Sequence, residues 1–274
     1  MNHINDFTNY LKAKRMSDKT IKDYTSNVAK MLNFINKSDE DITYTDLLNW
    51  LASINHLSSA TVQQRIVSVR RYFSVLKKLG FIDTNPAEEL ESIKVNNKQK
   101  VVLSNVEMRA LIDSAKNIRD KAIISLLSHS AMRVGELINL KVSDIENDAF
   151  VIHGKGDKER VVYLDDETKR YIHAYLDVRK NGCNNLFVGN QGNPMNEQCI
   201  SDMLKVTARR TGIINNPDRV APHLLRASRA TALDEAGVSV SVIKEVLGHA
   251  SIATTQIYLK TNPARVSSAM ALGI

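Results

Sequence analysis

The second half of this 274-residue chain contains a small set of side chains that could do chemistry. Arg133 and Glu136 are three residues apart, and His223 and Arg226 repeat that spacing, so each pair would share one face of a helix. An arginine fork can donate two parallel hydrogen bonds to an oxyanion. Histidine can transfer a proton near neutral pH. The two pairs therefore have the residue types for binding an anion and moving a proton beside it.

Three further residues could join these pairs. Lys155 lies at the tip of a predicted Gly-rich turn, Gly154–Asp157. His249 follows Gly248 at the predicted end of a helix, and Tyr258 lies nine residues further on. A tyrosine phenol can act as the nucleophile in covalent catalysis.

Each of these features also has a simpler interpretation. An Arg–Glu pair at this spacing is usually a surface ion pair that contributes little stability. A histidine beside a proline is commonly structural, and one tyrosine among eight more often belongs to a core than to a site. A Gly-Lys-Gly sequence makes a good hairpin turn whatever the function. Taken one at a time, the simpler interpretation is favoured in every case.

The first ninety residues have apolar side chains at helical spacing, which predicts an all-helical region. Ser17 and Asp18 precede the second apolar run and could cap its helix. Gly80 and Asn85–Pro86 end the longest segment. The predicted helices cover approximately residues 4–11, 21–35, 45–54 and 59–79.

The longest of these helices is basic. A solvated surface would explain its charges if the segment stood alone, but they are also the candidates for contacts from this region to a polyanion such as a nucleic acid. The candidates are Arg65, Arg70, Arg71, Lys77 and Lys78.

The polar, basic segment 92–100 has no periodicity and is typical of a linker between domains at residues 1–91 and 101–274. In the second domain, Ala149–His153 and Arg160–Leu164 are β-prone and flank the Gly-rich turn, which predicts a hairpin. The predicted fold class is mainly α, with two domains and one small antiparallel sheet. Predicted helices of the second domain lie near residues 105–116, 118–130, 166–179, 196–211, 223–236, 239–247 and 251–260.

The net charge of the chain favours binding to a polyanion. The net charge is +7, divided as +4 over residues 1–100 and +3 over the remainder, so both regions are basic. No segment has the 18 or more apolar residues of a membrane span, and the polar N-terminus lacks the apolar core of a signal peptide. A cytoplasmic location, with no membrane partner, is therefore expected.

Taken together and in this order, the motifs resemble those of the tyrosine recombinase family, which includes phage integrases and Xer-type recombinases. The resemblance covers roughly residues 101–260, and four motifs in the family's order make it specific. The N-terminal helices are similar, more loosely, to the family's SAM-like core-binding domain, which clamps DNA. The matching motifs are Ala131–Leu137 with Leu140, the lysine hairpin Gly154–Arg160, His223–Arg226, and Leu247–His249 with Thr254, Thr255 and Tyr258.

The resemblance implies a site-specific DNA recombinase that cleaves and rejoins strands through a covalent 3′-phosphotyrosine intermediate. Tyr258 would attack the phosphodiester, while Arg133 and Arg226 would hold the phosphate on which charge develops. His223 would accept the phenol proton, and Lys155 would protonate the departing 5′-hydroxyl.

The remaining family positions have supporting roles. His249 would orient another phosphate oxygen, and Glu136 would orient Arg133 or its helix. Because side chains supply the charge and the ester stores the broken bond, no metal ion or other cofactor is expected. The family usually has a histidine after the H-x-x-R arginine, and here that position is Ala227. Since Ala227 is outside the catalytic set and all six catalytic positions are filled, an active enzyme is favoured.

The expected partner is double-stranded DNA with paired recombination half-sites. The resemblance implies a homotetramer in the synaptic complex, and a monomer is expected in free solution. Residues 264–274 carry a small apolar face of Val266, Met270 and Leu272. This face could dock on a neighbouring subunit or fold back on its own domain.

Two other functions remain open at this point. A type IB topoisomerase uses a similar constellation to relax supercoils, and a DNA-binding protein of the same fold could lack catalysis. A metal-dependent nuclease has no supporting cluster of carboxylates or histidines. Within recombination, integration or excision, cointegrate resolution and dimer resolution all use this chemistry.

Overall fold

The computed structural model describes residues 2–94, 102–145, 149–153, 159–180, 182–248 and 255. Its backbone contacts divide the chain into two compact units, Met1–Lys98 and Gln99–Ile274, each with its own hydrophobic core. Within the described residues, no helix has the length and apolar character needed to span a lipid bilayer.

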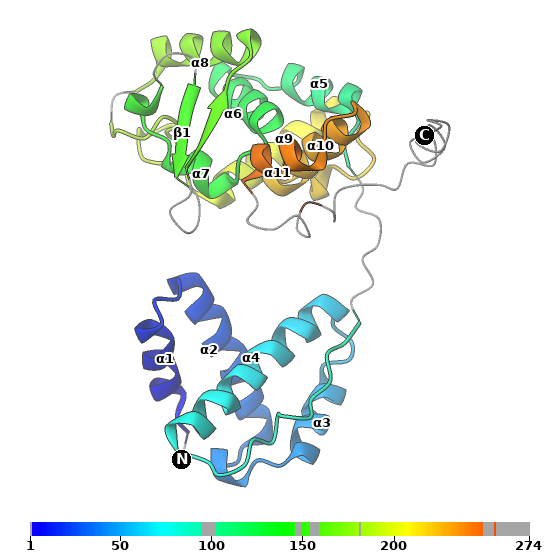
Figure 1. Ribbon diagram of the computed structural model, residues 1–274. Helices are drawn as coiled ribbons and strands as arrows, with labels where there is room; N and C mark the ends of the chain where they lie inside the picture. The colour runs from blue at the N-terminus through cyan, green and yellow to red at the C-terminus, as the bar shows by residue number, and fades with distance from the viewer. Residues whose placement is uncertain are drawn as a thin grey trace, which may run out of the picture. The chain divides into compact units, whose positions relative to one another are not determined.

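The first unit is helical, as its apolar periodicity predicts (Figure 1). Ser17, Thr43 and Ser58 each cap a helix by accepting a hydrogen bond from the backbone N–H three residues on. Gly80 ends the longest helix at φ 77°, a left-handed conformation that glycine adopts without strain. The elements are α1 (Ile4–Ala13), α2 (Asp18–Ile35), the short 3₁₀ helix η1 (Asp39–Asp41), α3 (Tyr44–Ser53) and α4 (Ser59–Leu79).

Aromatic side chains join α1 and α4 in the core of this unit. The Tyr72 ring meets Phe7 and Phe73 edge to face, with ring centroids 5.2 Å apart in both pairs. The Tyr72 hydroxyl donates to the buried carboxylate of Asp39 at 2.7 Å, so its polar end is satisfied. These contacts fix α4, the helix that carries the basic residues predicted to meet DNA.

The second unit contains seven α-helices, two short 3₁₀ helices (labelled η) and a two-stranded sheet within the residues that the structure describes. Its elements are α5 (Asn105–Asp113), α6 (Ile118–Ser130), α7 (Val134–Asn139), η2 (Val142–Asp144), β1 (Ala149–His153), β2 (Glu159–Tyr163), α8 (Asp166–Val178), α9 (Glu197–Thr211), η3 (Pro217–Arg219), α10 (Pro222–Glu235) and α11 (Val240–Leu247).

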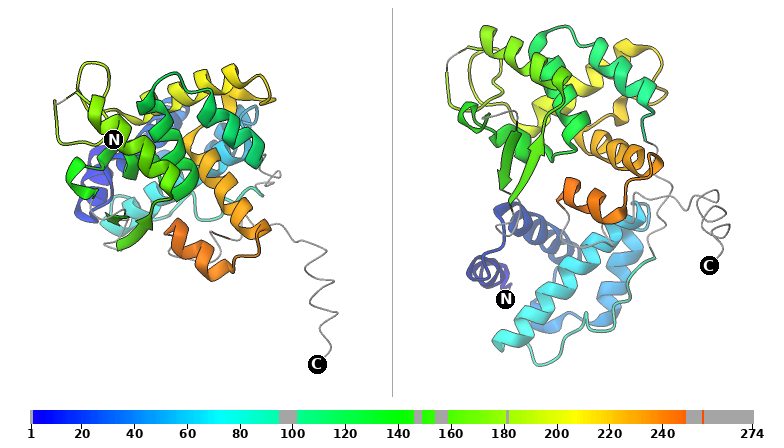
Figure 2. Two further views of the ribbon diagram at one scale, coloured as in Figure 1. Left: turned by 90° about the horizontal axis from the view of Figure 1, so that it is seen from above. Right: turned by 45° about the horizontal axis from the view of Figure 1, so that its top comes forward.

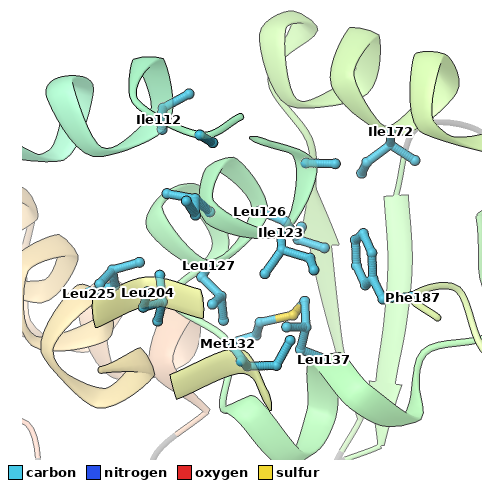
Figure 3. Close-up of a cluster of buried hydrophobic side chains, with 14 of the residues drawn as sticks. Ile112, Ile123, Leu126, Leu127, Met132, Leu137, Ile172, Phe187, Leu204 and Leu225 are labelled. Carbon is cyan, nitrogen blue, oxygen red and sulfur yellow. The ribbon is translucent and has the colours of Figure 1, made fainter. Parts of the chain in front are cut away.

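Helix α6 lies at the centre of this unit and packs against α5, α8 and α10. Every residue from Ala122 to Ser128 is buried, so the helix has no solvated face in that segment. Figure 3 shows Ile123, Leu126 and Leu127 of α6 among side chains from the surrounding helices and strands. A helix held on all sides is a rigid support for the residues that follow its C-terminus.

The predicted hairpin forms, and its side chains alternate between solvent and core. β1 and β2 pair antiparallel with Val151 opposite Val161, and both of these side chains are exposed. Phe150 and Val162, on the other face, are buried in the core. The strand β2 and α11 are in contact, and the views in Figures 1 and 2 agree in placing the hairpin and α11 at one end of the unit. This end of the unit holds the candidate site.

Candidate active site

Arg133 lies between the end of α6 and the start of α7. It is the residue that precedes α7, rather than a member of the helix as its spacing from Glu136 had suggested. Its backbone N–H donates to Glu136 Oε2 at 2.8 Å, and its guanidinium Nη1 donates to Oε1 at 2.9 Å. The side chain is 42% exposed, so the guanidinium is open to a ligand from solvent.

The turn before Arg133 is unusual. Ala131 ends α6 with φ 52°, a left-handed conformation that costs a non-glycine residue about 1–2 kcal/mol. The Ala131 carbonyl accepts a hydrogen bond from Arg226 Nη1 at 2.6 Å. Arg226 therefore stabilises the turn that directs Arg133 out of the core.

Arg226 lies on α10, one turn after His223. The two residues share the predicted spacing but differ in burial: His223 is exposed, whereas Arg226 is only 3% exposed. Arg226 Nη2 donates to the carbonyl of Leu247, the last residue of α11. Both of these acceptors are peptide carbonyls, which carry no net charge.

The two arginines meet at the end of α11. Arg133 Nη2 donates to the carbonyl of Gly248 at 3.2 Å, and Arg226 binds the preceding carbonyl, that of Leu247. Gly248 has φ 61° and ends α11 in the left-handed conformation. Side chains from two distant segments therefore converge on consecutive peptide oxygens, immediately before position 249.

Glu136 is bound by a second arginine that the motifs had not singled out. Arg160, on β2, donates from Nη1 to Glu136 Oε1 at 3.1 Å and from Nη2 to Oε2 at 2.6 Å. Burial alone would raise the pKa of Glu136, but hydrogen bonds from Arg160 and Arg133 outweigh it and lower the pKa to about 2. Glu136 is thus a carboxylate at neutral pH and an acceptor, not a proton donor.

A charged residue at a core-facing strand position is the signal that could have found Arg160. Side chains alternate along a strand, and Arg160 shares its face with the buried Val162 and, across the hairpin, with Ile152. Arg160 falls within the lysine-hairpin motif, but no role was assigned to it there.

Three of the predicted catalytic residues lie outside the described residues: Lys155, His249 and Tyr258. Beyond Gly248 the structure describes only Thr255, which is fully buried. Among the described residues, no group of three or more histidine, cysteine, aspartate or glutamate side chains could hold a metal ion.

The basic residues predicted to meet DNA lie on α4 in the first unit. Arg71 and Lys78, seven residues apart, lie 5.6 Å and 5.9 Å from the centroid of the Tyr10 ring, and Lys14 lies 6.0 Å from it. We call Lys14, Arg71 and Lys78 the Tyr10 cluster. The other candidates differ: Lys77 lies 3.5 Å from Glu88, Arg70 is exposed, and Arg65 is partly buried.

Family models match both parts of the chain. Residues 101–265 match the phage integrase family, and residues 4–80 match the phage integrase N-terminal SAM-like domain. The chain is 32% identical over 284 residues to tyrosine recombinase XerD of Oceanobacillus iheyensis, covering 96% of this chain and 95% of the relative. It is 31% identical over 280 residues to tyrosine recombinase XerC of Corynebacterium glutamicum, covering 97% and 89%.

Solved structures show the same similarity. A XerA recombinase is 30% identical, with a TM-score of 0.57 over 99% of this chain and 98% of the other. A lambda integrase (75–356) dimer bound to a COC′ core site has a TM-score of 0.80 at 18% identity, covering 93% of each chain, which shows a shared fold.

Proposed function

The chain belongs to the phage integrase family and is a tyrosine-type site-specific recombinase, and on this basis we propose that Tyr258 is the residue that attacks DNA. The phenol oxygen bonds to the phosphorus of one phosphodiester, and the bond from phosphorus to the 5′ oxygen breaks. A 3′-phosphotyrosine ester and a free 5′-hydroxyl result. Attack by a 5′-hydroxyl on that ester reverses the chemistry and joins a new partner strand.

The negative charge that develops on the phosphate sets the activation barrier for DNA cleavage. Attack on phosphorus builds negative charge on the non-bridging oxygens, and positioned cations stabilise that charge more than the starting state. We assign Arg133 and Arg226 to these oxygens, with His249 on a further one. The observation that carries this assignment is the convergence of both arginines on the Leu247 and Gly248 carbonyls, immediately before His249 in the chain.

Proton transfer completes the step. In the proposal, His223 accepts the phenol proton, and its exposure at the start of α10 leaves it accessible to DNA. Lys155 donates a proton to the departing 5′ oxygen. Glu136 holds Arg133 and stays ionised, since its pKa is about 2.

A strand-transfer assay with two marked duplexes tests the function itself. A recombinase exchanges strands between the duplexes, whereas a type IB topoisomerase would only relax supercoiled DNA. A silent DNA binder would do neither. Neither alternative finds support among the relatives, which are named tyrosine recombinases.

We propose that the N-terminal domain, residues 1–91, clamps the duplex, with the Tyr10 cluster among its phosphate contacts. The cationic groups of this cluster lie close together around the Tyr10 ring. Each phosphate that such a group neutralises releases counterions from the DNA, which favours binding. Arg65, Arg70 and Lys77 remain candidates for further contacts on α4. DNA is the shared partner of this domain and the catalytic domain, and the cytoplasm is the proposed place of action.

Removing charge from the Tyr10 cluster should make DNA binding less sensitive to salt. For Arg71→Ala with Lys78→Ala, we expect the slope of log Kobs against log salt to fall by about 0.9 for each phosphate that the variant no longer neutralises. Filter binding or fluorescence anisotropy between 50 and 250 mM salt, roughly, measures it. Lys37→Ala is the control, because Lys37 of the same unit is paired with Asp46 and is not among the candidates for DNA contact. An unchanged slope in the double variant would remove the cluster from the interface.

The number of subunits in the recombining complex follows from the cleavage chemistry. Each nucleophile stays attached to the strand it has cut, so exchanging both strands of two duplexes takes four subunits. We therefore propose a homotetramer on paired half-sites, formed from monomers that are free in solution. Deleting residues 264–274 should weaken tetramer assembly and spare binding of one subunit to a half-site. Native mass spectrometry on synaptic DNA checks this, and a full yield of tetramer from the truncated protein would contradict a role for the tail in assembly.

A further inference from the structure

We propose that Arg160 is a positioning residue for DNA cleavage, which acts by neutralising Glu136 and by packing on Gly248. The inference rests on the proposed function, because it concerns the arginine that would hold the scissile phosphate. It adds a residue from β2, one strand of the hairpin, to the proposed site.

Arg160 and Arg133 bind the same carboxylate. Glu136 accepts two hydrogen bonds from the Arg160 guanidinium and two from Arg133, one of them from its backbone N–H. Arg160 is only 11% exposed and Glu136 only 10%, so this pair is shielded from water, whereas Arg133 is 42% exposed. The carboxylate is thus fixed on one side by a buried cation and holds an exposed one on the other.

The charges of these three groups explain why a second arginine is needed. Glu136 alone would cancel the charge of Arg133, and an arriving phosphate would meet a neutral ion pair. With Arg160 present, the three groups carry a net charge of +1, and the exposed member can present that charge to a phosphate. Coulomb interactions are strong where water is scarce. A net charge of +1 with Arg160, instead of zero without it, should therefore strengthen binding of the phosphate.

Arg160 also defines the turn after α11. A Cβ built on Gly248 would lie 2.8 Å from Arg160 Nη1, 3.2 Å from Cδ and 3.3 Å from Cζ. The guanidinium therefore occupies the space where any other residue at position 248 would place its side chain. Because Arg133 binds the Gly248 carbonyl, Arg160 contacts both ends of the Arg133 hydrogen-bond network.

Stability alone does not account for Arg160. Its strand position faces the core beside Val162 and Ile152, where an apolar side chain would pack without desolvating a charge. Its Nε is buried and has no hydrogen-bond partner among the described residues. An arginine with an unsatisfied donor at such a position is unfavourable for folding, which points to a use in the site.

The test measures covalent cleavage of a nicked suicide half-site by the full-length protein. Arg160→Met keeps most of the side-chain volume and removes the charge; we expect cleavage to slow by roughly 10–100-fold, the range seen when an outer-shell partner of a functional group is lost. Half-site affinity should change less than about threefold, because DNA binding is shared among many phosphate contacts. Arg109→Met is the control, since Arg109 also pairs with a carboxylate away from the site, its Nη1 donating to both oxygens of Glu167.

A double-mutant cycle separates positioning from simple support of the fold. In the Arg160→Met background, Glu136→Gln removes the carboxylate that cancels the charge of Arg133, so it should restore part of the lost cleavage rate. In the wild-type background the same substitution should slow cleavage. Arg160→Lys, which keeps the charge without the fork, should fall between wild type and Arg160→Met. Independent, multiplicative losses in the cycle would overturn the proposal.

Two further outcomes are decisive. If Arg160→Met does not fold, Arg160→Lys still tests the idea, because wild-type cleavage by that variant would show that the fork is not needed. Every cleaving variant is also combined with Tyr258→Phe. Adducts that persist without the Tyr258 phenol would refute the proposed nucleophile, whereas normal cleavage by Arg160→Met with full dependence on Tyr258 would refute only the role of Arg160.

Discussion

Tyr258→Phe is expected to abolish the covalent protein–DNA adduct and to leave half-site affinity nearly unchanged. Phenylalanine keeps the ring and loses only the attacking oxygen, so binding surfaces are preserved while no ester can form. Loss of a nucleophile that acts in covalent catalysis lowers the rate by at least about 10³-fold. Denaturing gel electrophoresis of a reaction with a nicked suicide substrate measures the adduct, and mobility shift measures the binding.

Tyr163→Phe is the control for this experiment. Tyr163 lies on β2 of the same unit and is 75% exposed, so its loss of a hydroxyl changes the surface and not the proposed chemistry. Adduct formation by this variant should equal that of wild type. A persistent adduct in Tyr258→Phe would show that another side chain attacks the phosphate.

Arg226→Ala is expected to remove cleavage and also to destabilise the protein, whereas Arg133→Ala should remove cleavage alone. Each substitution deletes a donor to the phosphate, which typically slows a reaction by about 10²–10³-fold. Arg226 is buried, and its loss leaves the Ala131 and Leu247 carbonyls without this donor. An unsatisfied buried polar group costs about 1–3 kcal/mol, so we expect a loss of roughly 2–5 kcal/mol of folding free energy.

Arg133 provides the comparison, because its side chain is 42% exposed and Arg160 continues to hold Glu136 in its absence. Its replacement should change stability by less than about 1 kcal/mol. Urea unfolding of both variants, followed by circular dichroism, measures the difference. Equal losses of stability, or a larger loss in Arg133→Ala, would contradict the structural role given to Arg226.

Local patterns predicted most of the secondary structure. The α4 helix ends at Gly80 as predicted, and α6 spans residues 118–130, because apolar spacing and end signals act over a few residues. Errors occur at the ends of elements: α5 stops at Asp113 rather than near 116, and β2 spans Glu159–Tyr163 rather than Arg160–Leu164. The mainly α fold class with its small antiparallel sheet is confirmed.

Local patterns could not predict contacts between residues that are far apart in the sequence. The bond from Arg133 to the Gly248 carbonyl joins residues 115 positions apart, and the bond from Arg226 to Ala131 joins residues 95 apart. Neither has a local signature, so the resemblance to a family supplied the set of catalytic positions. Arg160 was missed for a similar reason, because its partner Glu136 lies 24 residues earlier on another element.

The carbonyls at the end of α11 have a consequence for the protein before it meets DNA. A guanidinium with no acceptor in a partly dry site would tend to fold away or capture a stray anion. Peptide oxygens that carry no charge give both arginines a resting position. These two arginines are therefore already gathered and charged when DNA arrives. An incoming phosphate takes the place of these peptide oxygens while Glu136 continues to hold Arg133, and little rearrangement of the pair remains to slow the first strand cut.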